Sequence, residues 1–420
     1  MKLYVRKWIN RVVVAGAVAG IVSACNKELP DAEPIIPPST GGLSIFETIR
    51  ANGNIYSYLD SAIVRASAFN NPTGKLDTLL KKKSNVLTFF APDNDAFQRS
   101  FQLLGLPTGV STIKFFRPGQ LDTILRYHLI GGQKITAANI PSSFPNSLYL
   151  QSMFVLQPPS ATVPPGYRMP IFVGKQGTVT FANNIPVVSP PDQEVANGII
   201  NRTSFVLLPP SQVLWQRIAT DPDLTYLKAA VEKADEGDPA KTLQSALSNP
   251  AANLTVLAPS NLAFQQLLTA QITGALIAMG VDPATAAAQA AALASTPDVF
   301  NNPALAAVLT PTTVKGIVVY HLLAESHNNT FQGIRVFSNN IPSSDINSFT
   351  LLNTAVPIHP GVTLKATYGF NGVIAITAKG LANPTAANVQ INPTPAPGGT
   401  SDQHYINGTL HKIDQVLRPQ

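Results

Sequence analysis

The sequence predicts two similar domains in tandem, each built from helices and β-strands. The main observation is a repeat, because Leu87-Thr-Phe-Phe-Ala-Pro-Asp-Asn-Asp-Ala-Phe97 recurs as Leu254-Thr-Val-Leu-Ala-Pro-Ser-Asn-Leu-Ala-Phe264. Each half also carries a Tyr-His pair and closes on Asn-Gly followed by an apolar run. Since an internal repeat fixes the number of domains, 420 residues divide naturally into two.

The amino terminus has the pattern of a secretory signal. Lys2, Arg6, Lys7 and Arg11 precede an apolar stretch, Val12 to Ala24, that is too short to span a bilayer. The stretch ends in Val-Ser-Ala followed by Cys25, the only cysteine of the chain. This segment resembles a bacterial lipobox, which implies that residues 1–24 are removed and that Cys25 is acylated. An ordinary signal peptide with an incidental cysteine is the alternative.

These basic residues also explain the positive charge of the chain. The formal charge is +6, and removing the four cations of the signal leaves 6 − 4 = +2. Only 12% of the residues are charged, which argues against a basic stripe and therefore against a nucleic-acid partner.

The localisation follows from the lipobox. The resemblance implies a membrane anchor at Cys25, and Asn-Lys-Glu directly after it resembles a surface-export signal of lipoproteins from one Gram-negative phylum. We expect the outer membrane, with the body facing the medium; a body facing the periplasm is the alternative. The Pro-rich and then Gly-rich residues 25–42 are expected to be an extended tether.

The first domain is predicted over residues 43–210. Ser44 and Glu47 form a Ser-x-x-Glu capping box at the start of a helix. The run from Leu87 is read as a buried strand that ends at proline, and Asp93 is placed to cap the following helix. The closing Asn197-Gly favours a type I′ hairpin.

The second domain is predicted over residues 211–420 and follows the same order. Ser260 takes the capping position of Asp93, and Asn407-Gly opens the last strand. The halves differ by an Ala-rich insertion near 274–307, where Asp282-Pro opens an expected extra helix. Because the link between the domains is so short, we expect their relative orientation to be constrained.

Together these motifs resemble the fasciclin domain family, most specifically in the closing Asn-Gly-Thr-Leu-His-Lys-Ile-Asp-Gln-Val-Leu-Arg-Pro block that begins at Asn407. The resemblance implies an α+β fold, with each domain a wedge-shaped β-sandwich with packed helices. It also implies an adhesion or matrix protein. The first half departs from the closing pattern, since Asn201, Thr203 and Ser204 replace His411, Ile413 and Asp414.

The Tyr-His pairs are the candidate partner-binding residues. Tyr127, His128, Tyr320 and His321 lie in a region that the resemblance links to receptor binding in animal members of the family. The alternative, which we favour, is structural, with a core aromatic beside an imidazole that bonds to backbone groups.

The sequence indicates binding rather than catalysis. It contains no metal-ligand spacing such as His-Glu-x-x-His, no Gly-x-Ser-x-Gly elbow and no phosphate-binding loop. We therefore expect no catalytic residues, no cofactor and no metal. Adhesion to an extracellular or envelope protein or glycan is the first hypothesis. An accessory role in an envelope complex that captures polysaccharide is the second, and an enzyme without a recognised motif is the third.

Overall fold

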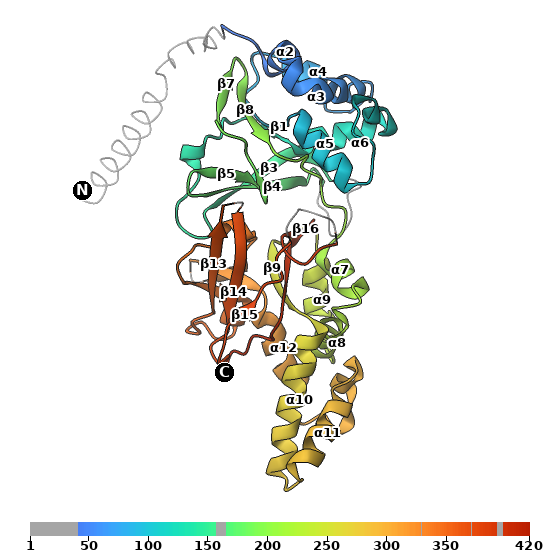
Figure 1. Ribbon diagram of the computed structural model, residues 1–420, viewed down its shortest axis with the longest axis vertical. Helices are drawn as coiled ribbons and strands as arrows, with labels where there is room; N and C mark the ends of the chain where they lie inside the picture. Colours follow the sequence, from blue (N-terminus) through green and yellow to red (C-terminus); the bar gives the residue numbers. More distant parts are fainter. Residues whose placement is uncertain (1–40, 157–164, 329, 371, 393–397) are drawn as a thin grey trace, which may run out of the picture. The chain divides into compact units, whose positions relative to one another are not determined.

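The computed structural model describes residues 41–156, 165–328, 330–370, 372–392 and 398–420. Residues 42–420 form one compact unit. Cys25 and the predicted signal and tether up to residue 40 lie outside the described residues. The fold within 42–420 mixes helices and sheets, as predicted (Figure 1).

The first half begins with helices. They are α2 (Ile45–Ala51), α3 (Gly53–Ala66), α4 (Leu76–Lys81), α5 (Asn94–Leu103) and α6 (Pro118–Tyr127), with the 3-10 turns η1 (Val110–Phe115) and η2 (Ala137–Asn139). The capping box at α2 is confirmed, because the Ser44 hydroxyl accepts from the amide of Glu47 and the Glu47 carboxylate accepts from the amide of Ser44. Asp93 caps α5 by accepting from the amide of Ala96 at 2.8 Å, also as predicted.

The strands of the first half form one eight-stranded sheet in the order β6-β5-β4-β3-β2-β1-β8-β7. They are β1 (Leu87–Pro92), β2 (Leu129–Gly131), β3 (Ser147–Val155), β4 (Arg168–Gln176), β5 (Val179–Ala182), β6 (Ile185–Pro186), β7 (Gln193–Val195) and β8 (Gly198–Thr203). Strands β1 and β8 pair in parallel, with Leu87 opposite Gly198.

The second half repeats this order with an addition. Its helices are α7 (Leu214–Thr220), α8 (Thr225–Ala234), α9 (Thr242–Ser248), α10 (Asn261–Ala278), α11 (Pro283–Leu293) and α12 (Pro311–Tyr320), with short 3-10 turns η3 (Pro297–Asn301), η4 (Pro303–Leu305), η5 (Ser338–Asn340) and η6 (Leu351–Thr354). Ser260 caps α10 and Asp282 caps α11, as the residue pattern predicts. The addition is α11, which runs beside the long α10 (Figure 1).

The strands of the second half lie in two sheets. One has the order β11-β10-β12-β13-β14-β15 and the other β16-β17-β9. The strands are β9 (Leu254–Pro259), β10 (Leu323–His327), β11 (Thr330–Gly333), β12 (Ile346–Thr350), β13 (Val362–Gly369), β14 (Gly372–Lys379), β15 (Ala387–Asn388), β16 (Gln403–Tyr405) and β17 (Gly408–Ile413). Strand β9 pairs in parallel with β17, and Leu254 lies opposite Gly408, in the same register as β1 and β8.

The repeated strand separates two apolar cores in each half. Leu87, Phe89 and Ala91 pack among the helices, whereas Phe90 points to the opposite face and packs among the strands. In the second half, Val256 and Leu257 divide in the same way. Since side chains of a strand alternate between faces, a strand covered on both sides is mostly apolar, and the one polar side chain of β1, Thr88, is buried and donates to the carbonyl of Gln133 at 2.9 Å. This explains why the repeated run carries no polar side chain that reaches solvent.

The closing Asn-Gly motifs have a different role from the predicted one. Val195 pairs with Gly198, so the two turn residues are Ala196 and Asn197, and Asn197 does not have a positive φ. A type I′ turn requires positive φ at both central residues. The prediction of a type I′ hairpin at Asn-Gly is therefore wrong.

Instead, each asparagine side chain joins the last hairpin to two helices. Asn197 accepts from the amide of Ile45 at 2.8 Å and donates to the carbonyl of Leu80 at 2.8 Å. Asn407 repeats both bonds, accepting from Leu214 at 2.9 Å and donating to Leu247 at 2.8 Å. The side-chain amide of each asparagine thus pairs with one N–H group at a helix start and one carbonyl at a helix end, neither of which has a partner within its own helix.

Replacing Asn407 by alanine should lower the free energy of unfolding by about 2–4 kcal/mol, because it leaves a buried amide and a buried carbonyl without partners. Urea denaturation measures the effect, and Asn70→Ala at an exposed position is the control. If both variants lose the same small amount, the two bonds contribute nothing to stability.

Candidate functional site

The predicted candidates Tyr127, His128, Tyr320 and His321 are all buried, with at most 1% of each residue exposed. Each pair ends a helix and faces inward, so a partner that binds the folded protein cannot touch these side chains. The Tyr127 hydroxyl donates to the carbonyl of Pro170 at 3.2 Å.

Both histidines hold the closing segment of their half against a helix. His128 places Nδ1 2.7 Å from the carbonyl of Ile124, and its Nε2 lies 2.9 Å from the amide of Leu207. His321 repeats this arrangement with Ile317 at 2.8 Å and Leu417 at 2.9 Å. Because an amide can only donate, Nε2 is the unprotonated nitrogen and Nδ1 donates to the carbonyl. Burial lowers the pKa of each imidazole to about 4, so both are neutral at pH 7.

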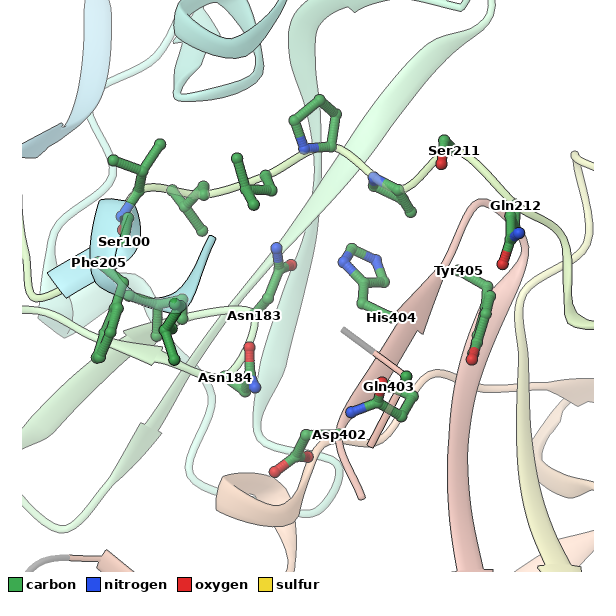
Figure 2. A pocket seen from close by; sticks show the side chains of 18 of the residues that line it. Ser100, Asn183, Asn184, Phe205, Ser211, Gln212, Asp402, Gln403, His404 and Tyr405 are labelled. Carbon is green, nitrogen blue, oxygen red and sulfur yellow. Dashed lines mark hydrogen bonds between the residues drawn. The ribbon is translucent and has the colours of Figure 1, made fainter. Parts of the chain in front are cut away.

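The candidate functional site is a cavity of about 370 Å³ where residues of the two halves meet. This volume lies in the range of small-molecule sites. Figure 2 shows Asn183 and Asn184 from the first half facing Asp402, Gln403 and His404 from the second. The remaining lining residues are Ser100, Leu103, Leu104, Ile185, the connecting segment 205–212, Arg217, Gly398 and Tyr405.

Polar contacts join the two halves beside this cavity. The Asn339 side chain donates to the carbonyl of Asn183 at 3.1 Å, and Asn340 donates to the side chain of Asn146 at 3.1 Å. The guanidinium carbon of Arg335 lies 4.7 Å from the ring centroid of Phe172. These contacts across the junction agree with the constrained orientation that the short link predicts.

Arg335 determines which ring nitrogen of His404 carries the hydrogen. The Arg335 Nη1 lies 2.9 Å from His404 Nε2, and Nη1 and Nη2 also donate to the carbonyls of Tyr405 at 3.3 Å and Ile406 at 3.2 Å. Burial lowers the pKa of Arg335 to about 10, so the guanidinium stays charged at pH 7. Since a guanidinium has no acceptor, His404 must accept through Nε2 and carry its hydrogen on Nδ1. Burial, together with the charge of Arg335, holds the pKa of His404 well below its usual range.

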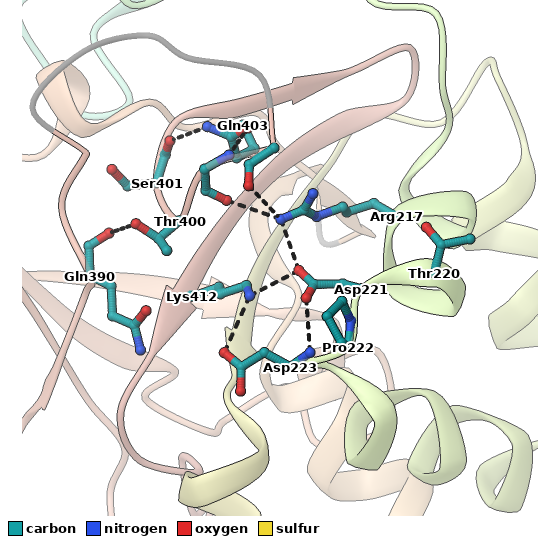
Figure 3. Close-up of polar contacts among 12 residues, drawn as sticks. Arg217, Thr220, Asp221, Pro222, Asp223, Gln390, Thr400, Ser401, Gln403 and Lys412 are labelled. Carbon is teal, nitrogen blue, oxygen red and sulfur yellow. Dashed lines mark hydrogen bonds and ion pairs between the residues drawn. The ribbon is translucent and has the colours of Figure 1, made fainter.

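One edge of the cavity is bordered by an ion-pair network (Figure 3). Asp221 lies 2.8 Å from the guanidinium of Arg217 and 2.9 Å from the ammonium of Lys412, which also contacts Asp223 at 3.2 Å. Burial alone would raise the pKa of Asp221. The bonds from Lys412 and from the Asp223 amide, with the charge of Arg217, outweigh burial and lower this pKa overall.

Replacing Lys412 by methionine should lower the free energy of unfolding by about 2–3 kcal/mol, because Asp221 would stay buried with one cation fewer. The matched control is Lys228→Met, whose exposed pair with Glu232 should contribute less than about 0.5 kcal/mol. Chemical denaturation of both variants decides the point, and equal losses would show that the network does not stabilise this half.

Sequence reasoning did not find Arg335, His404 or the cavity. Arg335 contacts residues about 70 positions later in the chain, and the cavity needs Asn184 from one half beside His404 from the other. No local spacing encodes such contacts. The available signal was an arginine in an apolar run, Gly-Ile-Arg-Val-Phe at residues 333–337, without an acidic residue nearby.

The described residues include no group of three or more His, Cys, Asp or Glu side chains arranged to hold a metal ion. Within that same part of the chain, no helix is both long enough and apolar enough to cross a bilayer.

Comparisons with known proteins give a family match over part of the chain. The model of the fasciclin domain family matches residues 66–209. Among solved structures, the chain is similar to a FAS1 domain pair from the insect cell adhesion molecule fasciclin I, with 14% identity, a TM-score of 0.31 and coverage of 89% of this chain and 95% of that one. No curated protein matches the chain.

The internal repeat extends this result to the second half. Strands β9 and β17 reproduce the parallel pairing and register of β1 and β8, and His321 reproduces both bonds of His128. Fasciclin domains are in general non-enzymatic and related to cell adhesion. The chain thus has the predicted α+β fold of tandem fasciclin-like domains, and its residues 66–209 match the fasciclin domain family.

Proposed function

We propose that this chain is a lipid-anchored binding protein of the cell envelope that acts in adhesion or partner interaction through its fasciclin-like domains. The observation that carries the proposal is the fasciclin match over residues 66–209, because domains of this family are related to adhesion. The resemblance of the segment before Cys25 to a lipobox supports the proposed location. Acyl chains on that cysteine would hold the body at the outer membrane, since each buried CH₂ contributes about 0.8 kcal/mol.

The arrangement of the titratable groups favours binding over catalysis. His128 and His321 are buried, and both ring nitrogens of each are occupied by backbone groups. His404 bonds through Nε2 to a guanidinium and is held neutral, so it has no proton acceptor to offer a substrate. A general base needs a free lone pair within reach of a substrate proton.

Binding can be tested with purified residues 42–420 on arrays of matrix proteins and glycans. The adhesion proposal expects saturable binding to at least one matrix protein. Binding to glycans alone would contradict it, and binding to neither class would leave a scaffold inside the envelope as the better description. Heat-denatured protein on the same array controls for binding by exposed apolar surface.

The anchor is tested by fractionation of cells that express Cys25→Ser. The wild-type chain should stay with the membranes and be released by detergent, while the variant should be soluble. A variant that still fractionates with membranes would refute the anchor.

An accessory role in an envelope complex that captures polysaccharide is the second candidate function. The cavity favours it, because its lining combines amide side chains with apolar and aromatic surface. Co-purification of the tagged chain from detergent-solubilised envelopes would test this role, which requires a stoichiometric transporter partner.

A further inference from the structure

We propose that the cavity between the two halves binds a neutral saccharide. The inference rests on the proposed binding function and names the chemistry of the ligand at this site. Three observations carry it: the balance of charge around the cavity, a set of unused polar groups on its wall, and an apolar segment that connects the two halves along one side.

Each charged side chain around the cavity already has an ion-pair or hydrogen-bond partner within the protein. Arg217 on the lining contacts Asp221, and Asp402 accepts from the amide and hydroxyl of Ser338 at 2.7 and 2.6 Å. Arg335 is buried next to His404, and its Nη1 and Nη2 donate to that ring and to the carbonyls of Tyr405 and Ile406. Together with the bordering ion-pair network, the three cations Arg217, Arg335 and Lys412 balance the three carboxylates Asp221, Asp223 and Asp402. Because the net charge is zero and the lining cation Arg217 already pairs with Asp221, the site favours a neutral ligand over an anion.

Several polar groups on the wall remain open to a ligand. The side chains of Asn184, Ser211 and Gln212 bond to no other group in the described part of the chain, and none of the three is buried. His404 adds a fixed Nδ1–H donor, because Arg335 occupies its Nε2. The wall thus offers amide groups that both donate and accept, a hydroxyl and a ring N–H. This set is complementary to vicinal hydroxyls, which also donate and accept.

A sugar ring also needs an apolar surface against its C–H groups. The segment that connects the two halves provides this surface. Leu208, Pro209 and Pro210 line the cavity together with Phe205. A ligand with only hydrogen-bonding groups would leave this apolar surface in contact with water. A purely apolar ligand would leave the side chains of Asn184 and Gln212 without hydrogen-bond partners. Sugars present both kinds of surface on one ring.

The test is isothermal titration of residues 42–420 with five neutral trisaccharides (maltotriose, cellotriose, xylotriose, mannotriose and galactotriose) and with trigalacturonate. We expect at least one neutral sugar to bind with a Kd of about 1 mM or tighter, and trigalacturonate, the charged counterpart of galactotriose, to bind at least about tenfold more weakly. Asn184→Ala and Gln212→Ala should each weaken binding about three- to tenfold. Ser211→Trp should abolish binding by filling the cavity.

Gln289→Ala on the exposed face of α11 is the matched control and should leave the affinity unchanged. An unchanged Tm for each variant shows that the effects do not come from unfolding. In ¹⁵N NMR spectra, the Nδ1 signal of His404 should shift on addition of the sugar that binds.

Three results would overturn the inference. They are no saturable binding of any neutral trisaccharide, binding that Ser211→Trp leaves intact, and preferred binding of trigalacturonate, since the site would then select charge. If the same protein still binds a matrix protein on the array, the proposed function stands and only the saccharide inference fails. If it binds neither, both fail.

Discussion

Replacing Gly198 by alanine is expected to lower the free energy of unfolding by more than about 4 kcal/mol, enough to unfold many domains of this size. A Cβ atom at this position would lie 2.0 Å from the carbonyl oxygen of Leu87 and 2.8 Å from its carbon. Both are backbone atoms of the paired strand β1, so no side-chain rotation can relieve the contact. The only escape is to separate β1 from β8, which removes the parallel ladder at the centre of the first half.

The control for Gly198→Ala is Gly316→Ala in helix α12, where nothing lies within 4 Å of the added methyl group. This variant should be unchanged or more stable by up to about 1 kcal/mol, because alanine favours a helix over glycine. Circular dichroism during thermal unfolding measures both. A Gly198→Ala protein with the wild-type Tm would show that the two strands are not as close as described.

The second large effect is a loss of stability in mild acid. His128 and His321 have a pKa of about 4 when folded and about 6.5 when unfolded, so between these pH values the unfolded chain binds protons that the folded chain does not. Stability should be complete above pH 6.5, fall as the pH drops, and level off with respect to these groups below about 4. At about 1.4 kcal/mol for each pKa unit, protonation lowers the free energy of unfolding by an amount on the order of 7 kcal/mol for the two histidines together.

Urea denaturation at a series of pH values between 4 and 7.5 checks this expectation. His321→Gln removes one of the two groups and should make the pH dependence shallower, although the variant is less stable at pH 7. His327→Gln changes an exposed histidine and should keep the wild-type slope. If the free energy of unfolding depended on pH equally in the wild type and both variants, the buried imidazole of His321 would not cause the loss of stability in acid.

The repeated strand-to-helix block was predictable because its information is local. A run such as Leu87 to Pro92 is apolar on both faces, and Asp93 caps the helix that follows it, so neighbouring residues determine both elements. The repeat also predicted that the Tyr-His pairs serve the fold, since both copies occupy the same helix end. Their burial agrees with that interpretation.

The closing motifs and the cavity were not predictable, because they depend on residues far apart in the chain. Asn197 was expected to shape its own turn, but its amide bonds to Ile45 and Leu80, more than a hundred residues away. Gly198 is required by the nearby backbone of Leu87 and not by the turn. The tautomer of His404 also depends on a residue far away in the sequence, because the guanidinium of Arg335 occupies its Nε2.

Location tests the central claim most directly, because a protein that adheres to a partner outside the cell must expose its body there. Intact cells that express the chain are treated with a protease that cannot enter, and the remaining body is detected by antibody. We predict that the body is digested on intact cells while a periplasmic marker survives. A body that resists digestion until the outer membrane is permeabilised would contradict adhesion to an outside partner.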